Sequence, residues 1–332
     1  MFSFNMRGKR HLIGNIQLTP DKYSELKAKL VEELASELER KKQLPTLFEM
    51  VPKGKPGLMT LLGTTKHASG PEVKEDMMPI ERAFAETSEV VLSKPLKLGA
   101  LKAYLGKHVR GVNATASCLS GLKVYYSDMG YDKAMAATGR LITIDEQNRV
   151  SEIRKWPRGL DEKCNMEWIK KLIDEVALFC PHIDIQSSNM PECLSVQNSH
   201  ACYHSARVYF TKYSAYCFWP RDSDRVFGCD AIRNSSFCIN CYSSYKLTRC
   251  FEADTSQNCT GSYFIHNCEN VHDSIFCFNT KNKRYAIANQ EVGREQFLRI
   301  KKLTLDDIVS RLERNGEIKQ SIYNLGVASG VL

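Results

Sequence analysis

The sequence predicts an α+β protein with a C-terminal parallel β-solenoid of roughly 18-residue coils, a long N-terminal amphipathic helix and a small α+β middle domain. Three observations predict this fold class. Cysteines recur at steps of nine residues, at Cys241, Cys250, Cys259, Cys268 and Cys277. The end of this series is repeated near the N-terminus, and apolar residues after the N-terminal copy recur at helical spacing.

The nine-residue step indicates a repeat architecture, because self-similarity at a fixed period is typical of stacked structural units. Taken in pairs, the steps form rows rich in Ser, Thr, Asn, Tyr, Phe and Cys that contain no proline and are too polar for a pair of helices. We expect coils of short parallel strands, with small side chains inside and Asn and Ser at the corners. The cysteine spacing is looser upstream, so the solenoid is expected over residues 190–292.

A second copy of the closing coil lies at the N-terminus, where position 2 matches position 276 and the offset stays constant. The N-terminal set is Phe2, Phe4, Asn5, Arg7, Lys9, Arg10, Ile13 and Asn15. The C-terminal set is Phe276, Phe278, Asn279, Lys281, Lys283, Arg284, Ile287 and Asn289. A single coil cannot bury its own interior face. We therefore expect the N-terminal coil to stack on an open solenoid end, in its own chain or a neighbouring one, and we take both sets except Lys281 as assembly residues.

The N-terminal region, residues 1–50, continues from this coil into a helix. Thr19 is a suitable N-cap and Pro20 a suitable first helical residue. Leucines at helical spacing then continue to Lys42. Residues 51–88 are expected to be an extended arm, because Gly, Pro, Lys and Thr dominate their first half.

The middle region, residues 89–189, reads as a small α+β domain. We expect an edge strand at 90–98, a strand at 121–127 and a hairpin formed by 140–144 and 150–156. Asn165 should cap an apolar helix that Pro181 ends. Residues 293–332 are expected to hold two helices, the second capped by Thr304, and a small apolar tail.

The cysteines invite two interpretations. Free cysteine is among the most buried residue types, and stacked identical coils place like residues in columns, so interior filling is one. Metal binding is the other, with Cys238, Cys241, His200 and His204 as candidates. The number of cysteines is 13, which is odd, and no signal-peptide core is visible, so we expect reduced thiols and cytoplasmic synthesis.

Composition limits the partners. The chain has 332 residues, a net charge of +8 and 43% hydrophobic residues, enough for one or two cores. Acidic and basic residues are interleaved, which favours a solvated surface over a polyanion-binding stripe. No apolar run is long enough to cross a bilayer, so a membrane partner is not expected.

The nine-spaced cysteines, the closing pattern Phe-x-Phe-Asn-x-(Arg/Lys)-x-Lys-Arg-x-x-Ile-x-Asn and the helix after it resemble a group of Cys-rich β-solenoid proteins. These are predicted from uncultivated bacteria, archaea and their tailed viruses. The resemblance covers residues 193–302 and, in fragment, 1–42. It implies the solenoid fold and no particular activity, since most of the group has no assigned function. Relatives often begin with a zinc ribbon, which this chain lacks, so the resemblance does not extend to metal binding.

We expect a non-enzymatic structural or self-assembly protein without a cofactor, because no catalytic motif is visible. It would form a homo-oligomer or larger assembly, such as a shell or virus-particle (capsid) component with other particle proteins. One alternative is a metal- or nucleic-acid-binding module that uses the Cys/His candidates and the basic loops Arg7–Arg10 and Lys281–Arg284. Another is a carbohydrate-active solenoid, which requires carboxylates such as Asp222, Asp224 and Asp230 to converge in one groove.

Overall fold

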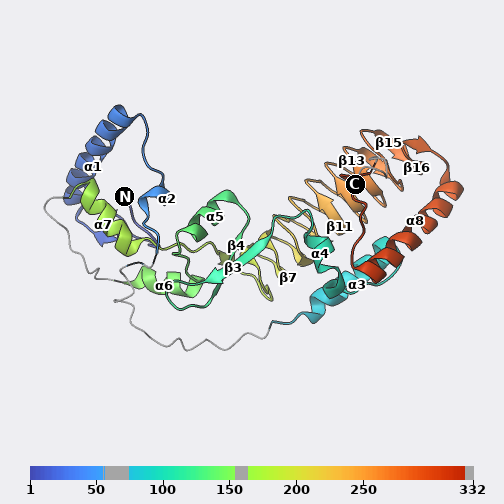
Figure 1. The fold of residues 1–332 in the computed structure, drawn as a ribbon, viewed down its shortest axis with the longest axis horizontal. Coiled ribbons are helices and arrows are strands. Elements are labelled where there is room, and N and C mark those ends of the chain that lie inside the picture. The colour runs from blue at the N-terminus through green and yellow to red at the C-terminus, as the bar shows by residue number, and fades with distance from the viewer. Residues whose placement is uncertain (55, 57–74, 154–163, 326–332) are drawn as a thin grey trace. The chain divides into compact units, whose positions relative to one another are not determined.

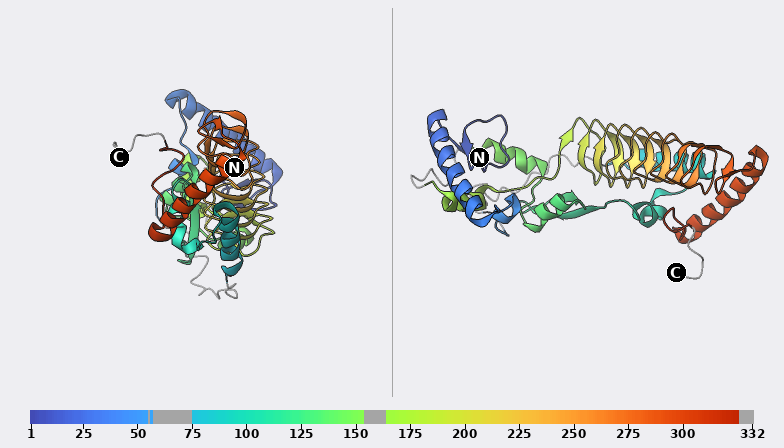
Figure 2. Two further views of the ribbon diagram at one scale, coloured as in Figure 1. Left: turned by 90° about the vertical axis from the view of Figure 1, so that its right-hand side faces the viewer. Right: turned by 90° about the horizontal axis from the view of Figure 1, so that it is seen from above.

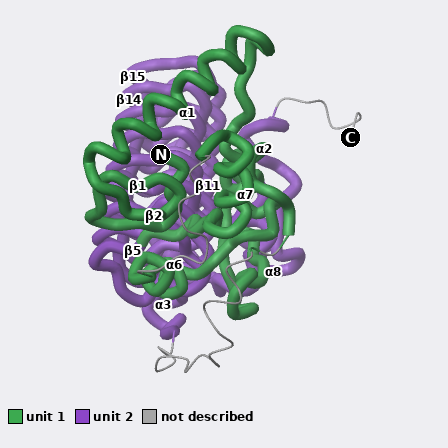
Figure 3. Tube along the Cα trace, turned by 90° about the vertical axis from the view of Figure 1, so that its left-hand side faces the viewer, with its two compact units in different colours: residues 1–72, 113–183 green, residues 73–112, 184–332 purple. Residues whose placement is uncertain are grey.

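Residues 184–284 form a parallel β-solenoid of about 8 turns in the computed structural model, which describes residues 1–54, 56, 75–153 and 164–325. The chain divides into two units (Figure 3). Unit 1 contains residues 1–72 and 113–183, and unit 2 contains residues 73–112 and 184–332. The solenoid lies in unit 2, and its coils follow one another in a regular stack (Figures 1 and 2).

The strands of the solenoid are short and pair in parallel. They are β5 (Asp184–Ile185), β6 (Leu194–Gln197), β7 (His200–Tyr203), β8 (Ala206–Tyr209), β9 (Lys212–Ala215), β10 (Asp224–Phe227), β11 (Ser236–Tyr242), β12 (Phe251–Asp254), β13 (Tyr263–His266), β14 (Glu269–His272) and β15 (Lys281–Arg284). Ile239 pairs with Phe251, and Phe251 pairs with Tyr263. Hydrogen bonds between successive coils likewise join residues 12 apart. The coil therefore has 12 residues, and the predicted length of roughly 18 is wrong.

The backbone explains this length. Every third residue from Gln186 to Ala288 has a positive φ, so each coil has four sides of three residues with a left-handed corner between them. Two of these corner residues are glycine, and Thr255 is the single β-branched one, as expected for a conformation that crowds a branched side chain. A step of nine covers three of the four sides. Successive cysteines therefore turn around the coil instead of forming one column.

The interior is narrow and its polar groups are paired. Ser256 shows the pattern: its hydroxyl donates to the carbonyl of Asp254 at 2.8 Å and accepts from the N–H of Cys268 at 3.2 Å. The thiol of Cys250 lies 3.5 Å from the carbonyl of Cys259, nine residues later on the adjacent coil. Small residues with one polar atom can thus fill the interior without leaving a buried group unsatisfied.

The remaining elements of unit 2 are helices that pack on the outside of the solenoid and a C-terminal hairpin whose Ala286 belongs to the solenoid interior. They are α3 (Met78–Leu92), the 3-10 helix η2 (Leu98–Leu101), α4 (Lys102–Gly106), β16 (Ala286–Ile287), β17 (Gln290–Glu291) and α8 (Arg294–Asn315). One apolar core joins α3, η2, α4 and α8 with outward aromatic residues of the coils, such as Phe227 and Phe251.

The strand predicted at 90–98 is wrong, because α3 continues to Leu92. The two predicted C-terminal helices are one, with Thr304 in its interior.

Unit 1 contains β1 (Leu12–Ile13), β2 (Ile16–Gln17), α1 (Pro20–Lys41), α2 (Leu47–Met50), β4 (Lys123–Ser127), α5 (Gly130–Ala137), α6 (Ile144–Glu152), α7 (Met166–Val176) and β3 (Val112–Ala116), which pairs with β4. Thr19 and Asn165 cap α1 and α7 as predicted. The predicted hairpin is wrong: its supposed turn is the first turn of α6, which a capping box between Thr143 and Glu146 begins. Of the arm predicted at 51–88, residues 55 and 57–74 lie outside the described residues, as does the tail after residue 325. From Met78 onward the prediction of an extended arm is wrong, because these residues form α3.

Candidate functional site

The duplication predicted from the sequence is present in the structure. The hairpin β1–β2 corresponds to β16–β17 with the same register. Helices α1 and α8 both have 22 residues and begin at matching positions, 20 and 294. We call residues 1–41 the N-terminal repeat and residues 275–315 the C-terminal repeat. Each consists of one coil, a hairpin and a helix.

The details of the two repeats also correspond. The N–H of Leu18 donates to the carbonyl of His11 at 3.0 Å, as that of Val292 does to Tyr285 at 3.0 Å. The His11 ring lies 5.4 Å from the ring of Tyr23. In the C-terminal repeat the corresponding rings of Tyr285 and Phe297 are 5.7 Å apart. The two copies are therefore the same structural unit, placed once in unit 1 and once in unit 2.

Each repeat has a face directed towards a preceding coil, which we call the ladder face. In the C-terminal repeat this face is filled. The N–H groups of Phe276, Asn279 and Tyr285 donate to the carbonyls of residues 263, 266 and 272 at 3.0, 3.0 and 3.3 Å. The interior residue Cys277 is fully buried above the preceding coil. This is how the last coil of the solenoid is held.

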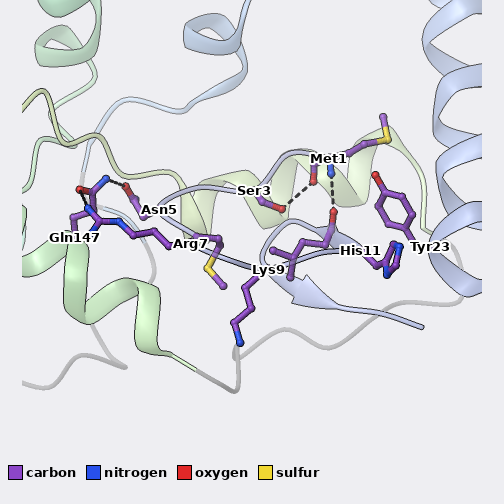
Figure 4. Close-up of a pocket in the computed structure, with 10 residues that line it drawn as sticks. Met1, Ser3, Asn5, Arg7, Lys9, His11, Tyr23 and Gln147 are labelled. Atoms are coloured by element: carbon purple, nitrogen blue, oxygen red, sulfur yellow. Dashed lines mark hydrogen bonds between the residues drawn. The ribbon is translucent and has the colours of Figure 1, made fainter. Parts of the chain in front are cut away.

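The ladder face of the N-terminal repeat is open. The corresponding N–H groups of Phe2, Asn5 and His11 have no hydrogen-bond acceptor among the described residues. A hollow of about 540 Å³ lies beside Asn5 and His11, and Figure 4 shows the side chains that line it. It is lined by Met1, Ser3, Asn5, Met6, Arg7, Lys9, His11, Leu12, Tyr23 and Gln147. Ser3, Met6, Lys9 and Leu12 are the interior positions of the coil, so the hollow is the open mouth of a solenoid end.

Gln147 of α6 holds one edge of this mouth. Its amide donates to Asn5 Oδ1 at 3.1 Å and accepts from Arg7 at 3.3 Å (Figure 4). Asn5 also donates to the carbonyl of Leu178 at 3.0 Å. In the C-terminal repeat, the side chain of Asn267 in the preceding coil donates to Asn279 in the same way, at 2.8 Å. The N-terminal coil is thus fixed in place while its ladder face stays free of backbone pairing.

We call the opposite face of each repeat the cap face. It is covered in the N-terminal repeat and open in the C-terminal repeat. In the N-terminal repeat it is covered: a Cβ on Gly14 would lie 1.9 Å from Leu172 of α7, and Phe4 packs edge-on against Phe179 at 5.9 Å. In the C-terminal repeat, Ala288 takes the place of Gly14 and is exposed. An apolar groove of about 430 Å³ lies there, lined by Phe276, Phe278, Ala288, Asn289 and Leu325.

The predicted assembly residues have different surroundings in the two repeats. Phe4, Ile13 and Asn15 are buried in unit 1, whereas Phe278 and Ile287 are half-buried and Asn289 is exposed. Phe2 and Phe276 are half-buried, and Asn279 is exposed. The sequence pattern identifies these coil residues but not the α8 residues that contact the rest of unit 2, because the matched sets end at Asn15 and Asn289.

The two basic loops, Arg7–Arg10 and Lys281–Arg284, differ in their surroundings, and the second has a structural role in the solenoid. In the C-terminal repeat, Lys281 pairs with Glu269 of the preceding coil at 2.6 Å, and Arg284 lies 3.9 Å from Asp273. Lys283 is half-buried in the coil. In the N-terminal repeat, Lys9 and Arg10 are exposed. The carboxylates on the preceding coil neutralise much of the C-terminal loop, which weakens the case for phosphate binding there.

The metal candidates are not brought together. Cys238 and Cys241 are buried on adjacent sides of the solenoid interior. His200 lies beside the Ser188 hydroxyl at 2.8 Å, and His204 beside Glu192 at 2.7 Å. Within residues 1–54, 56, 75–153 and 164–325, no group of three or more His, Cys, Asp or Glu side chains is arranged to hold a metal ion.

The candidate carboxylates of a sugar-cleaving site do not converge either. Asp222 lies 3.7 Å from Arg233, and Asp224 lies 2.8 Å from Arg225. Asp230 accepts from Arg110 at 3.1 Å. Each carboxylate is therefore held by an arginine, which does not favour the free pair of acid and base that sugar cleavage requires.

No helix in the described part of the chain is long and apolar enough to span a bilayer. No protein-family model, curated protein or solved structure matches the chain.

Proposed function

We propose that the protein is a non-enzymatic, self-assembling structural protein whose N-terminal repeat receives the end of a β-solenoid. The supporting observation is the open ladder face, where the N–H groups of Phe2, Asn5 and His11 lack acceptors among the described residues. Unpaired strand edges are templates for pairing with another chain. The same coil in the C-terminal repeat has that face filled by a solenoid coil.

Energetic arguments support this role. The mouth of the N-terminal coil is lined by interior positions that include the half-buried Met6 and the buried Leu12, at a rim of unpaired backbone groups. Stacking a coil there would bury apolar surface and satisfy backbone donors at once, since each net hydrogen bond contributes about 1 kcal/mol. A component of a protein shell or virus particle, assembled from such contacts, remains our prediction for the wider role.

The test is the mass of the protein in solution, measured by light scattering over a range of concentrations. The wild type is expected to assemble as concentration rises. Met6→Glu places a carboxylate where an apolar interior would stack and should weaken assembly, because an unpaired buried charge is costly. Ser24→Glu, an equal charge change at an exposed position of α1, is the matched control and should assemble normally.

Two results would contradict the proposal. A wild type that stays monomeric at every concentration removes the assembly itself. A Met6→Glu variant that assembles as well as Ser24→Glu shows that the open mouth is not the contact.

A further inference from the structure

Helix α8 contacts the rest of unit 2 through three kinds of side chain. Its apolar stripe, Leu305, Ile308, Val309 and Leu312, is buried in the core shared with α3, η2 and α4. The ammonium of Lys301 lies 4.9 Å from the ring centroid of Tyr263 in the preceding coil. Glu313 pairs with Lys94 at 2.8 Å. Together these contacts lock the helix onto the side of the solenoid.

Helix α1 carries the same kinds of residue at the same positions. Its stripe is Val31, Leu34, Ala35 and Leu38, its lysine is Lys27 and its carboxylate is Glu39. Leucine, lysine and glutamate are identical at three of these matched positions, 38 and 312, 27 and 301, and 39 and 313. The remaining stripe positions are apolar in both helices.

Positions of α8 that face solvent match only in part. Arg299, Lys302 and Leu303 are exposed. Their counterparts in α1 are Glu25, Ala28 and Lys29. Exposed Ser310 and Arg314 nevertheless have identical counterparts in Ser36 and Arg40, so the agreement extends over the whole helix and includes the positions where α8 touches its own unit.

In α1 these residues are exposed, except for the half-buried Leu34. Val31 is 47% exposed and Leu38 is 45% exposed, whereas Leu312 is 1% exposed. Glu39 makes no ion pair with any described residue. Helix α1 uses a different face to pack on α7, through Leu26 and Leu30. A set of residues suited to the side of a solenoid is thus presented next to the open ladder face.

We propose that the N-terminal repeat of one molecule binds the solenoid of a second copy in the place of that copy's own C-terminal repeat. Lys27 would stack on Tyr263 of the second copy, Glu39 would pair with its Lys94, and the α1 stripe would pack on its α3, η2 and α4. This inference rests on the proposed function and specifies the partner and its binding surface.

Exchange of equivalent elements is a low-cost route to association, because each interaction that breaks within one molecule is replaced by an interaction of the same kind between molecules. The N–H groups of Phe2, Asn5 and His11 would take over the acceptors that Phe276, Asn279 and Tyr285 use, at residues 263, 266 and 272. The receiving surface is occupied by the C-terminal repeat in each copy, so one repeat must leave before the other binds. Assembly should therefore be slow and accelerated by conditions that loosen α8.

Zero-length cross-linking of the full-length protein tests this arrangement. A carbodiimide joins an ammonium and a carboxylate that are in contact, and a mixture of unlabelled and heavy-isotope-labelled protein shows whether the joined residues belong to different molecules. In monomer, Lys94 should be linked to Glu313. In the assembled fraction, we expect Lys94 linked to Glu39 in peptides of mixed isotope.

The outcomes separate this inference from the proposed function. Assembled protein with Lys94 linked to Glu313 alone overturns the exchange and leaves self-assembly intact. A Lys94–Glu39 link found solely within one isotope shows contact inside one chain and also overturns the exchange. Absence of any assembled fraction overturns both.

A matched pair of substitutions gives a second test. Leu38→Lys alters an exposed residue, so we expect an unchanged melting temperature. We expect the association constant to fall at least about tenfold, which is equivalent to about 1.4 kcal/mol. Leu312→Lys disrupts the buried counterpart, so we expect a lower melting temperature and a larger assembled fraction. Equal assembly of Leu38→Lys and wild type would overturn the exchange, whatever the fate of Leu312→Lys.

Discussion

The side chain of Asn289 closes the solenoid by pairing with the backbone of Phe278. Its amide donates to the Phe278 carbonyl at 2.8 Å, and its Oδ1 accepts from the Phe278 N–H at 2.8 Å. The side chain thereby imitates the next coil and leaves no free edge at this point. Asn15 and Phe4 repeat the arrangement at 3.0 and 2.7 Å.

The two asparagines predict unequal mutational effects. Asn15 is 2% exposed, whereas Asn289 is exposed, so water can replace the amide at position 289 but not at position 15. We expect Asn15→Ala to lower the free energy of unfolding by about 1 to 3 kcal/mol, the cost of leaving a buried group unpaired. Asn289→Ala should cost less, as measured by urea denaturation.

The backbone conformation requires a control, because φ is 68° at Asn15 and 69° at Asn289. Asn15→Gly tolerates this conformation but also loses the two hydrogen bonds. If Asn15→Gly is as stable as the wild type, the hydrogen bonds contribute nothing and the interpretation of Asn15 as a cap fails.

The left-handed corners predict that a β-branched residue placed there destabilises the fold. Asn258 is a suitable position to test this, because its side chain is exposed and its φ is 52°. Asn258→Val should lower the unfolding free energy by about 1 to 2 kcal/mol, since a β-branched residue is strained in this conformation. Asn258→Gly should be neutral or stabilising. Thermal denaturation of the two variants is the measurement, and equal melting temperatures would contradict the assignment of strain to the corner.

The nine-residue cysteine step predicts the solenoid because cysteine is a distinctive residue. The three-residue repeat of interior and corner positions is not visible in the sequence. The interior positions alternate among Cys250, Ala253, Ser256 and Cys259, which share small size but no obvious chemical class. The corner positions are equally mixed. The duplication was visible in the sequence because its pattern is long and its offset constant.

Contacts between distant residues could not be predicted. The position of Gln147 beside Asn5 depends on how α6 packs, and no sequence pattern links residues so far apart. The helix itself was missed because Leu141, Ile142 and Ile144 suggested a strand, although the capping box at Thr143 and Glu146 was readable. Local capping chemistry decided the structure here against β propensity.

Thiol chemistry gives a third prediction. Burial raises the pKa of Cys202 to about 12 and that of Cys259 to about 12, so neither forms appreciable thiolate near pH 8. The 13 cysteines should all react with iodoacetamide after denaturation. In the native protein, Cys202 and Cys259 should stay unmodified, as counted by mass spectrometry of the peptides. Rapid labelling of either at pH 8 would show that the solenoid interior opens readily.

Glu252 provides the last prediction, on the dependence of stability on pH. Its carboxyl is buried, and burial raises its pKa although the Ile322 N–H, the Tyr104 hydroxyl and the Asn240 amide donate to it. Because the folded pKa is above the unfolded value, the folded state binds the proton more tightly than the unfolded state. This contribution to stability is full below the unfolded pKa and is lost as pH rises through the folded pKa.

Glu252→Gln cannot ionise, so the variant should lose less stability than the wild type when urea denaturation is compared between about pH 4 and pH 8. Identical pH dependence in the two proteins would mean that the Glu252 carboxyl has the same pKa in the folded and unfolded states, and that its three donors fully offset the cost of burial.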